Sequence, residues 1–150
     1  MRQRLTSAAC CAVVALAAGA CGDPLSPTDV AGTYVLRSIA GDPLPAIAYT
    51  SPSFTTRVLA DTLRLRDDGT GSVTHTAVTD PPATGGPYTY TRDVRYTVND
   101  GRVSATLVCG PAELCVAGPH LVARAEGGGL VVEAALGQRV PQVYARVETR

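Results

Sequence analysis

After residue 31, hydrophobic and polar residues alternate along most of the chain, which is the pattern of β-strands with one buried face. The alternation is clearest in residues 88–98, YTYTRDVRYTV. The residues that share its apolar face are Tyr88, Tyr90, Val94, Tyr96 and Val98. Arg92 interrupts this face. We expect a bulge there or a position at the mouth of a barrel, because an unpaired buried guanidinium is very costly.

Short turns rich in Gly, Pro, Asn and Asp separate the strand-like segments, and DDGTG (67–71) and NDG (99–101) are typical of hairpins. The segments are 32–39, 56–66, 72–78, 88–98, 102–108, 119–126, 130–136 and 141–148. Within 56–66 the alternation places Leu59, Leu63 and Leu65 on one face. No long window has a convincing helical period. The pattern therefore predicts an all-β fold, an antiparallel up-and-down barrel of about eight strands.

The start of the chain, residues 1–20, has the layout of a secretory signal peptide. Arg2 and Arg4 form a basic head, residues 5–20 carry no charge, and the small residues 18–20 end the run. A retained transmembrane anchor is the alternative, but the apolar run is shorter than the roughly 20 residues that span a bilayer. We expect residues 1–20 to be removed on export.

Residues 18–21, Ala-Gly-Ala-Cys, resemble the lipobox of bacterial lipoproteins. The resemblance implies that the Cys21 thiol takes a diacylglycerol, that cleavage precedes it, and that the new amino terminus is acylated. Several acyl chains anchor a protein durably, whereas one holds it only marginally. Gly22 stands where an Asp would resemble an inner-membrane retention signal, which favours the outer membrane, facing the periplasm or the cell surface. The alternative is a secreted soluble protein with Cys21 free or paired.

The organisation that follows is a short connection and one domain. Residues 21–30 contain two prolines and no period, so we expect a flexible tether. Residues 31–150 then form the barrel domain. Three of its stretches are GTYVLRSIAGDPLP (32–45), DTLRLRDDGTGSVT (61–74) and YARV (144–147). Together they resemble the lipocalin-like domain of small bacterial lipoproteins, and this resemblance implies a β-barrel over most of residues 31–148.

Charge and glycine patterns exclude several kinds of partner. The chain has 13 basic and 13 acidic residues, and the part after the signal peptide is slightly acidic. No basic patch is present, so nucleic acid is not an expected partner. The GGG run (127–129) lies in a hairpin instead of between a strand and a helix, so it does not indicate a phosphate loop. We expect no cofactor.

Cys109 and Cys115 bracket a short loop, GPAEL. In an exported protein two nearby cysteines favour a disulfide, worth about 2 kcal/mol for so small a loop. A redox pair is the functional alternative, but the spacing is not C-x-x-C. Reduced thiols remain a further possibility. The second pair of ligands that a structural zinc site requires is missing from the sequence.

The two histidines, His75 and His120, fall on different strands. A metal site would need a third ligand such as Asp61 or Glu126, and nothing in the spacing demands one. We therefore expect surface or rim histidines and no metal site.

A catalytic triad can be written from Ser72 or Ser104 with His75 and Asp93. The G-x-S-x-G motif and its strand-turn-helix context are missing. We assign no catalytic residues and expect a protein that is not an enzyme.

The tyrosines Tyr34, Tyr88, Tyr90 and Tyr96 are candidate ligand-binding residues. Tyrosine offers an apolar body and a hydroxyl that seeks a partner, and a small barrel is either filled by side chains or holds one small ligand. The first hypothesis is a cell-envelope lipoprotein whose barrel binds a small hydrophobic or amphipathic ligand. The alternative is a filled barrel, a structural or interaction module that presents loops 79–87 and 110–118 to another envelope protein whose identity is unknown.

Overall fold

The computed structural model describes residues 25–81, 86–111, 113 and 118–148. The predicted signal peptide, Cys21 and Cys115 lie outside these residues. Within them, no helix has both the length and the apolar character that crossing a membrane requires.

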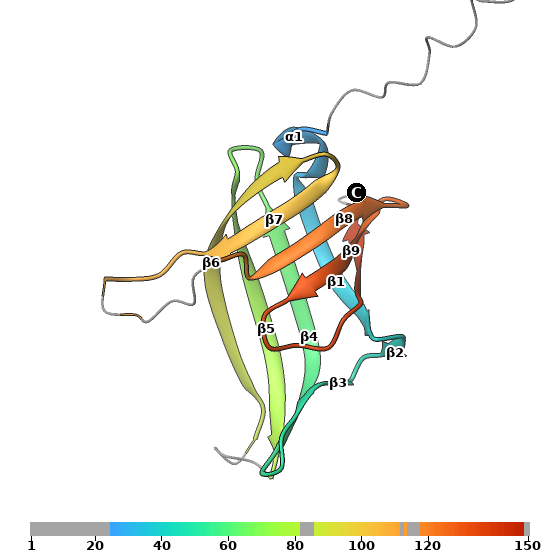
Figure 1. Cartoon of the computed structure of the whole chain (residues 1–150), viewed down its shortest axis with the longest axis vertical. Helices are drawn as coiled ribbons and strands as arrows, with labels where there is room; N and C mark the ends of the chain where they lie inside the picture. Colours follow the sequence, from blue (N-terminus) through green and yellow to red (C-terminus); the bar gives the residue numbers. More distant parts are fainter. Residues whose placement is uncertain (1–24, 82–85, 112, 114–117, 149–150) are drawn as a thin grey trace, which may run out of the picture.

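The described chain is almost entirely β-structure (Figure 1). Its elements are α1 (Pro27–Val30), β1 (Gly32–Ile39), β2 (Asp42–Pro43), β3 (Ala46–Thr50), β4 (Thr55–Leu65), β5 (Thr70–Asp80), β6 (Tyr88–Asn99), β7 (Arg102–Leu107), β8 (Leu121–Glu126), β9 (Gly129–Ala135) and β10 (Gln142–Val147). From β4 to β10 each strand pairs antiparallel with the next, and β1 joins β10 to β4. The result is a closed barrel of eight antiparallel strands, which confirms the predicted fold class.

The two short strands β2 and β3 extend the sheet beside β1 and β4, respectively. β1 pairs with residues 62–65 of β4, and β3 pairs with residues 55–58. The chain leaves the barrel after β1 at Ala40 and Gly41, which both have positive φ, pairs briefly as β2, and returns as β3. The sequence predicted a turn here but not these two strands.

One end of the barrel is closed by α1. Val30 is buried, its carbonyl oxygen accepts a hydrogen bond from the Tyr34 hydroxyl at 2.8 Å, and the Pro27 carbonyl accepts one from the Tyr96 hydroxyl at 3.1 Å. The Asp29 carboxylate accepts hydrogen bonds from the backbone and hydroxyl of Ser26 and so caps the helix. Residues 27–30 therefore belong to the folded domain and not to a tether.

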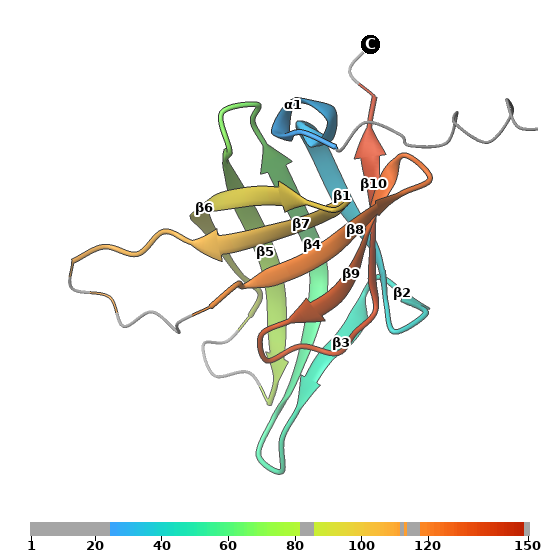
Figure 2. The same cartoon turned by 45° about the horizontal axis from the view of Figure 1, so that its top comes forward.

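The opposite end flares open because β4, β5 and β6 run beyond the shorter strands β7 to β9, as Figures 1 and 2 both show. β6 pairs with β5 from Tyr88 onwards but with β7 only from Val94. In the described part of the chain, residues 88–92 thus have a paired strand on one side only. Their inner face is partly open to solvent, and Tyr88 and Tyr90 are exposed.

A β-bulge in β4 changes which residues face inward. The register with β5 shifts between Val58 and Ala60, so Leu59 lies in the bulge. Val58 is fully buried and Leu59 only partly so, and the prediction that Leu59 shares the inner face with Leu63 is wrong. A bulge bends its strand and re-aims the side chains next to it. Here the bulge turns Val58 into the barrel, whereas Asp61 keeps the inward phase of Leu63 and Leu65.

Candidate functional site

A cavity of about 280 Å³ lies inside the barrel, between its middle and the open end. Its apolar lining residues are Leu63, Val73, Val94, Ala105, Leu107, Leu121 and Ala135. Its polar lining residues are Asp61, His75, Tyr90, Arg92, His120, Gln138, Gln142 and Tyr144. The aliphatic side chains come from β4 to β9, and β10 contributes the polar residues Gln142 and Tyr144.

Three buried polar residues, Asp61, His75 and Tyr144, form one hydrogen-bonded cluster. Asp61 and His75 are cross-strand partners on β4 and β5, and Nδ1 of His75 lies 2.7 Å from Oδ2 of Asp61. The Tyr144 hydroxyl, from β10 across the barrel, donates to Oδ1 of Asp61 at 3.0 Å. The three residues are 7 %, 6 % and 3 % exposed. Both carboxylate oxygens are therefore satisfied in a place where an unpaired charge would be very costly.

The Tyr144 hydroxyl keeps its proton in this environment. Burial raises the pKa of Tyr144 well above its usual value of 10.0, and the Asp61 charge and the hydrogen bond to it raise this pKa further. In the described part of the chain no arginine lies within 4.0 Å of the Asp61 carboxylate. The side chains that stabilise the Asp61 carboxylate are thus the Tyr144 phenol and the His75 imidazole.

His120 and Gln142 supply further polar groups to the cavity. Burial lowers the pKa of His120 below its usual value of 6.5, with a smaller lowering from His75 and an opposing effect of Asp61, so this ring is neutral at neutral pH. Gln142 is 1 % exposed, and its Nε2 donates to Oε1 of Gln138 at 2.5 Å and to the Arg139 carbonyl at 3.4 Å. These bonds hold the β9–β10 loop against the rim of the cavity.

Arg92 lies at the barrel mouth, the second of the two positions expected for it. Its guanidinium lines the cavity and pairs with the carboxylate of Glu113, and both side chains are more than two-fifths exposed. The pairing raises the pKa of Arg92 and lowers that of Glu113 through the hydrogen bond between them. Exposed pairs of this kind contribute little to stability. This one neutralises a charge at the entrance.

The four candidate tyrosines are divided between the two ends of the barrel. Tyr34 and Tyr96 are 3 % and 4 % exposed and bind carbonyl groups of α1 at the closed end. Tyr90 lines the cavity, and its ring lies 5.3 Å from that of His75, its cross-strand partner. Tyr88 stacks on Tyr90 at 6.4 Å, further toward the open end. Of the four, only Tyr90 lines the cavity, and Tyr88 stacks on it.

The expectation of surface or rim histidines is wrong for His75, which lies in the interior of the barrel. His75 is buried and His120 half-buried, and both line the cavity together with Asp61. Even so, no group of three or more His, Cys, Asp or Glu side chains in the described residues is placed to hold a metal ion.

The serines considered for a triad lie away from the cavity. Ser72 pairs with Asp93 between β5 and β6, one position out of phase with the inward-facing Val73. Ser104 is likewise one position out of phase with Ala105 on β7. His75 points inward, so none of these residues forms a triad with it.

Tyr144 was not among the candidate residues and Asp61 was considered only as a third metal ligand, although the sequence contained a signal for both. Asp61 alternates with Leu63 and Leu65, and Tyr144 alternates with Gln142 and Arg146 on the last strand. Alternation places Asp61 on the leucine face. A buried carboxylate needs donors, which points to partners elsewhere in the barrel.

Cys109 is disulfide-bonded in the structure. Its predicted partner, Cys115, lies outside the described residues, so the pairing of these two cysteines stays a prediction. The functional interpretation of the barrel rests on its own residues, since no family model, no curated protein and no solved structure matches the chain.

Proposed function

We propose that this protein is a cell-envelope lipoprotein, similar to the lipocalin-like domains of small bacterial lipoproteins, whose barrel binds a small hydrophobic or amphipathic ligand without transforming it. One observation carries the proposal: the barrel is not filled, but holds a cavity of about 280 Å³ whose lining surface is mainly apolar and to which eight polar or charged residues also contribute. Ligand pockets of about 300–1,000 Å³ have this composition.

The dimensions of the cavity limit the ligand to a short molecule. A cavity of about 150 Å³ lined by aliphatic and aromatic side chains holds a benzene molecule. The cavity here is larger than that, but α1, Tyr34 and Tyr96 close the barrel beyond it. A compact ring system or a short branched chain fits this shape, and a long acyl chain does not.

The location follows from the start of the chain. We infer that Cys21 is the lipidated first residue of the mature protein, on the resemblance of residues 18–21 to a lipobox. Acylation at Cys21 would hold the barrel at the outer membrane, facing the periplasm or the cell surface. A lipid-attached binding protein there samples small molecules that partition into the envelope.

The cavity can be tested by filling it. Ala105 is 1 % exposed and lines the cavity, so Ala105→Leu places a branched side chain inside it. Thr106→Leu is the matched control, because Thr106 is the next residue of β7 and is exposed. Toluene binding by the purified full-length protein is followed by NMR shift changes. We expect binding to the wild type and to Thr106→Leu, and loss of binding in Ala105→Leu. Equal binding by both variants would place the ligand elsewhere.

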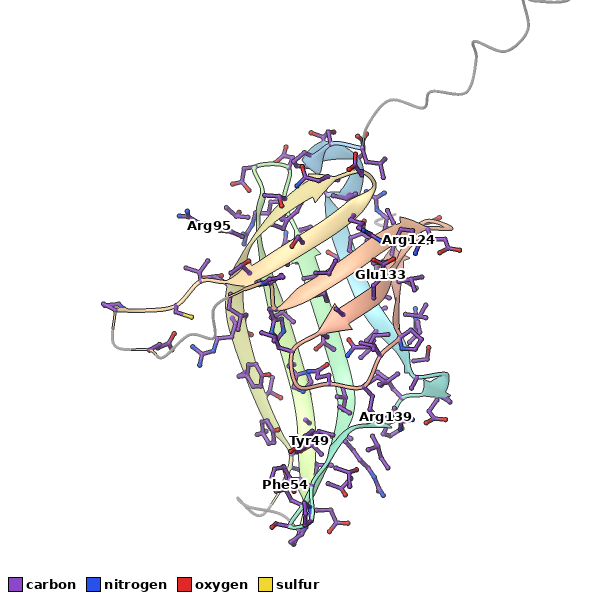
Figure 3. All side chains as sticks on the ribbon, in the orientation of Figure 1. Tyr49, Phe54, Arg95, Arg124, Glu133 and Arg139 are labelled. Carbon is purple, nitrogen blue, oxygen red and sulfur yellow. The ribbon has the colours of Figure 1, made fainter. Side chains whose placement is uncertain are left out.

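A second candidate function is an interaction module that presents its open end to another envelope protein. The observation in its favour is an exposed aromatic pair at that end, Tyr49 and Phe54, whose rings lie 5.6 Å apart (Figure 3). A photo-reactive group at position 54 would then give one discrete crosslinked product in intact cells. The same group in place of Arg95, on the outside of β6, would not.

A further inference from the structure

The hydrogen bond to Asp61 determines which nitrogen of a neutral His75 ring carries the proton. A carboxylate only accepts hydrogen bonds, so the proton between Oδ2 of Asp61 and Nδ1 of His75 lies on Nδ1. In a neutral imidazole the other nitrogen, Nε2, then carries a lone pair and accepts. The Asp61 carboxylate thus fixes the tautomer as well as the orientation of the ring.

Nε2 of His75 is available to a ligand. In the described part of the chain no residue makes a hydrogen bond to Nε2, and no fully buried side-chain nitrogen or oxygen is without a partner. Nε2 therefore keeps contact with open space, although the residue is only 6 % exposed. Since His75 lines the cavity, that space is the cavity.

The surroundings of Nε2 favour a planar, apolar molecule. The rings of His75, Tyr90 and Tyr88 follow one another along the inner face of β5 and β6. The lining also includes the aliphatic side chains of Leu107 and Leu121. Aromatic rings pack well against both kinds of surface.

The charge of the cluster argues against an anionic ligand. Asp61 contributes a negative charge beside His75, and the nearby cation, Arg92, is already paired with Glu113. A carboxylate ligand would meet this charge in an environment of low dielectric constant. An ammonium ligand could donate to Nε2, but removing a full charge from water costs far more than removing a hydroxyl.

We infer that the ligand class of this cavity is a small aromatic alcohol, a phenol, whose hydroxyl donates a hydrogen bond to Nε2 of His75 while its ring packs on Tyr90. This inference rests on the proposed ligand-binding function. His75 is the residue that determines specificity, and Asp61 and Tyr144 position it.

The test compares probes of similar shape on the full-length protein by calorimetry: phenol, anisole, toluene and benzoate. Water solvates phenol better than anisole, so an apolar cavity alone would favour anisole. We expect phenol to bind about tenfold more tightly than anisole, the equivalent of one hydrogen bond of about 1.4 kcal/mol. Benzoate should bind more weakly than phenol.

Two variants test whether the preference for phenol over anisole depends on the His75 ring. His75→Asn keeps an amide N–H near the position of Nδ1 for Asp61 but has no counterpart of Nε2. His120→Asn is the matched control on another wall of the same cavity. The preference for phenol should disappear in the first and persist in the second. If His75→Asn does not fold, the ¹⁵N resonance of Nε2 in the wild type serves instead: it should move with phenol and not with toluene.

The outcomes separate the two proposals. If anisole or toluene binds as tightly as phenol, or if the preference survives in His75→Asn, the phenol inference is overturned and the ligand-binding function stands. Tighter binding of benzoate than of phenol also overturns the inference. If no aromatic probe binds at all, the proposed function fails, and the inference fails with it.

Discussion

Replacing Tyr144 by Phe removes one hydroxyl from the barrel interior and leaves the ring in place. That hydroxyl donates to Oδ1 of Asp61 at 3.0 Å. Without it the buried carboxylate keeps only the bond to His75. A hydrogen bond to a charged group contributes about 1.5–3 kcal/mol, and a buried acceptor left without a donor costs a similar amount. We therefore expect Tyr144→Phe to lower the free energy of unfolding by about 2–3 kcal/mol.

Tyr34→Phe is the matched control. Tyr34 and Tyr144 are both 3 % exposed, and each hydroxyl makes one hydrogen bond. The acceptor of Tyr34 is an uncharged backbone carbonyl, that of Val30, at 2.8 Å. A bond between uncharged groups contributes about 0.5–1.5 kcal/mol. The difference between the two variants therefore isolates the charge on Asp61, because the apolar surface that each ring buries is unchanged.

Urea unfolding with a constant slope gives the two free energies directly. For a domain of this size about 1 kcal/mol corresponds to about 4 °C in Tm, so Tyr144→Phe should melt about 8–12 °C below the wild type. Repeating the substitution in Asp61→Asn completes a double-mutant cycle. There the cost should fall to that of Tyr34→Phe. Equal costs of Tyr144→Phe and Tyr34→Phe, or no coupling in the cycle, would refute a charged acceptor and with it the tautomer assigned to His75.

Three further predictions concern other parts of the chain. Burial lowers the pKa of His120 below 6.5, so on acidification the unfolded chain binds a proton at this residue before the folded chain does. The free energy of unfolding should therefore fall as the pH drops below about 6.5. Thermal melts across this range should show a weaker dependence of Tm on pH in His120→Asn. Gly129→Ala places a Cβ against the Tyr144 carbonyl and should cost about 1–3 kcal/mol in chemical unfolding, whereas Gly86→Ala meets open space and should be neutral. Cys21→Ser should abolish incorporation of labelled palmitate and leave an uncleaved or soluble precursor, and equal labelling of both proteins would contradict lipidation at this residue.

Local sequence patterns were sufficient to predict the eight barrel strands. Each of these strands overlaps a segment recognised by alternation, from Gly32 at the start of β1 to Val147 at the end of β10. The turns at Gly69 and Gly101 lie where DDGTG and NDG occur, and both glycines have positive φ. These features depend on residues close together in the chain, so the sequence displays them directly.

The bulge in β4 could not be predicted in this way. Alternation assumes that every second residue faces inward, and the extra residue at Leu59 breaks that count for Val58. Its effect is local to one strand, but it decides that Val58, and not Leu59, faces inward opposite Ala77. β3 and α1 were missed for a related reason: each is short, and each is stabilised by packing on the barrel and not by its own pattern.

The candidate site was harder to predict because it depends on depth along the barrel and not only on which face a residue occupies. Alternation places Tyr88, Tyr90 and Tyr96 on one face of one strand, and that is correct for the register with β5 and β7. Yet Tyr96 lies at the end closed by α1, where its hydroxyl binds backbone carbonyls, and Tyr90 lies where β7 has already ended. Depth is set by where each neighbouring strand stops and by which end a terminal segment covers, and both depend on contacts between distant parts of the chain. The bond between Asp61 and Tyr144 joins residues 83 positions apart. A sequence pattern can therefore show that such groups face inward, but only the closed barrel shows that they meet beside the same cavity.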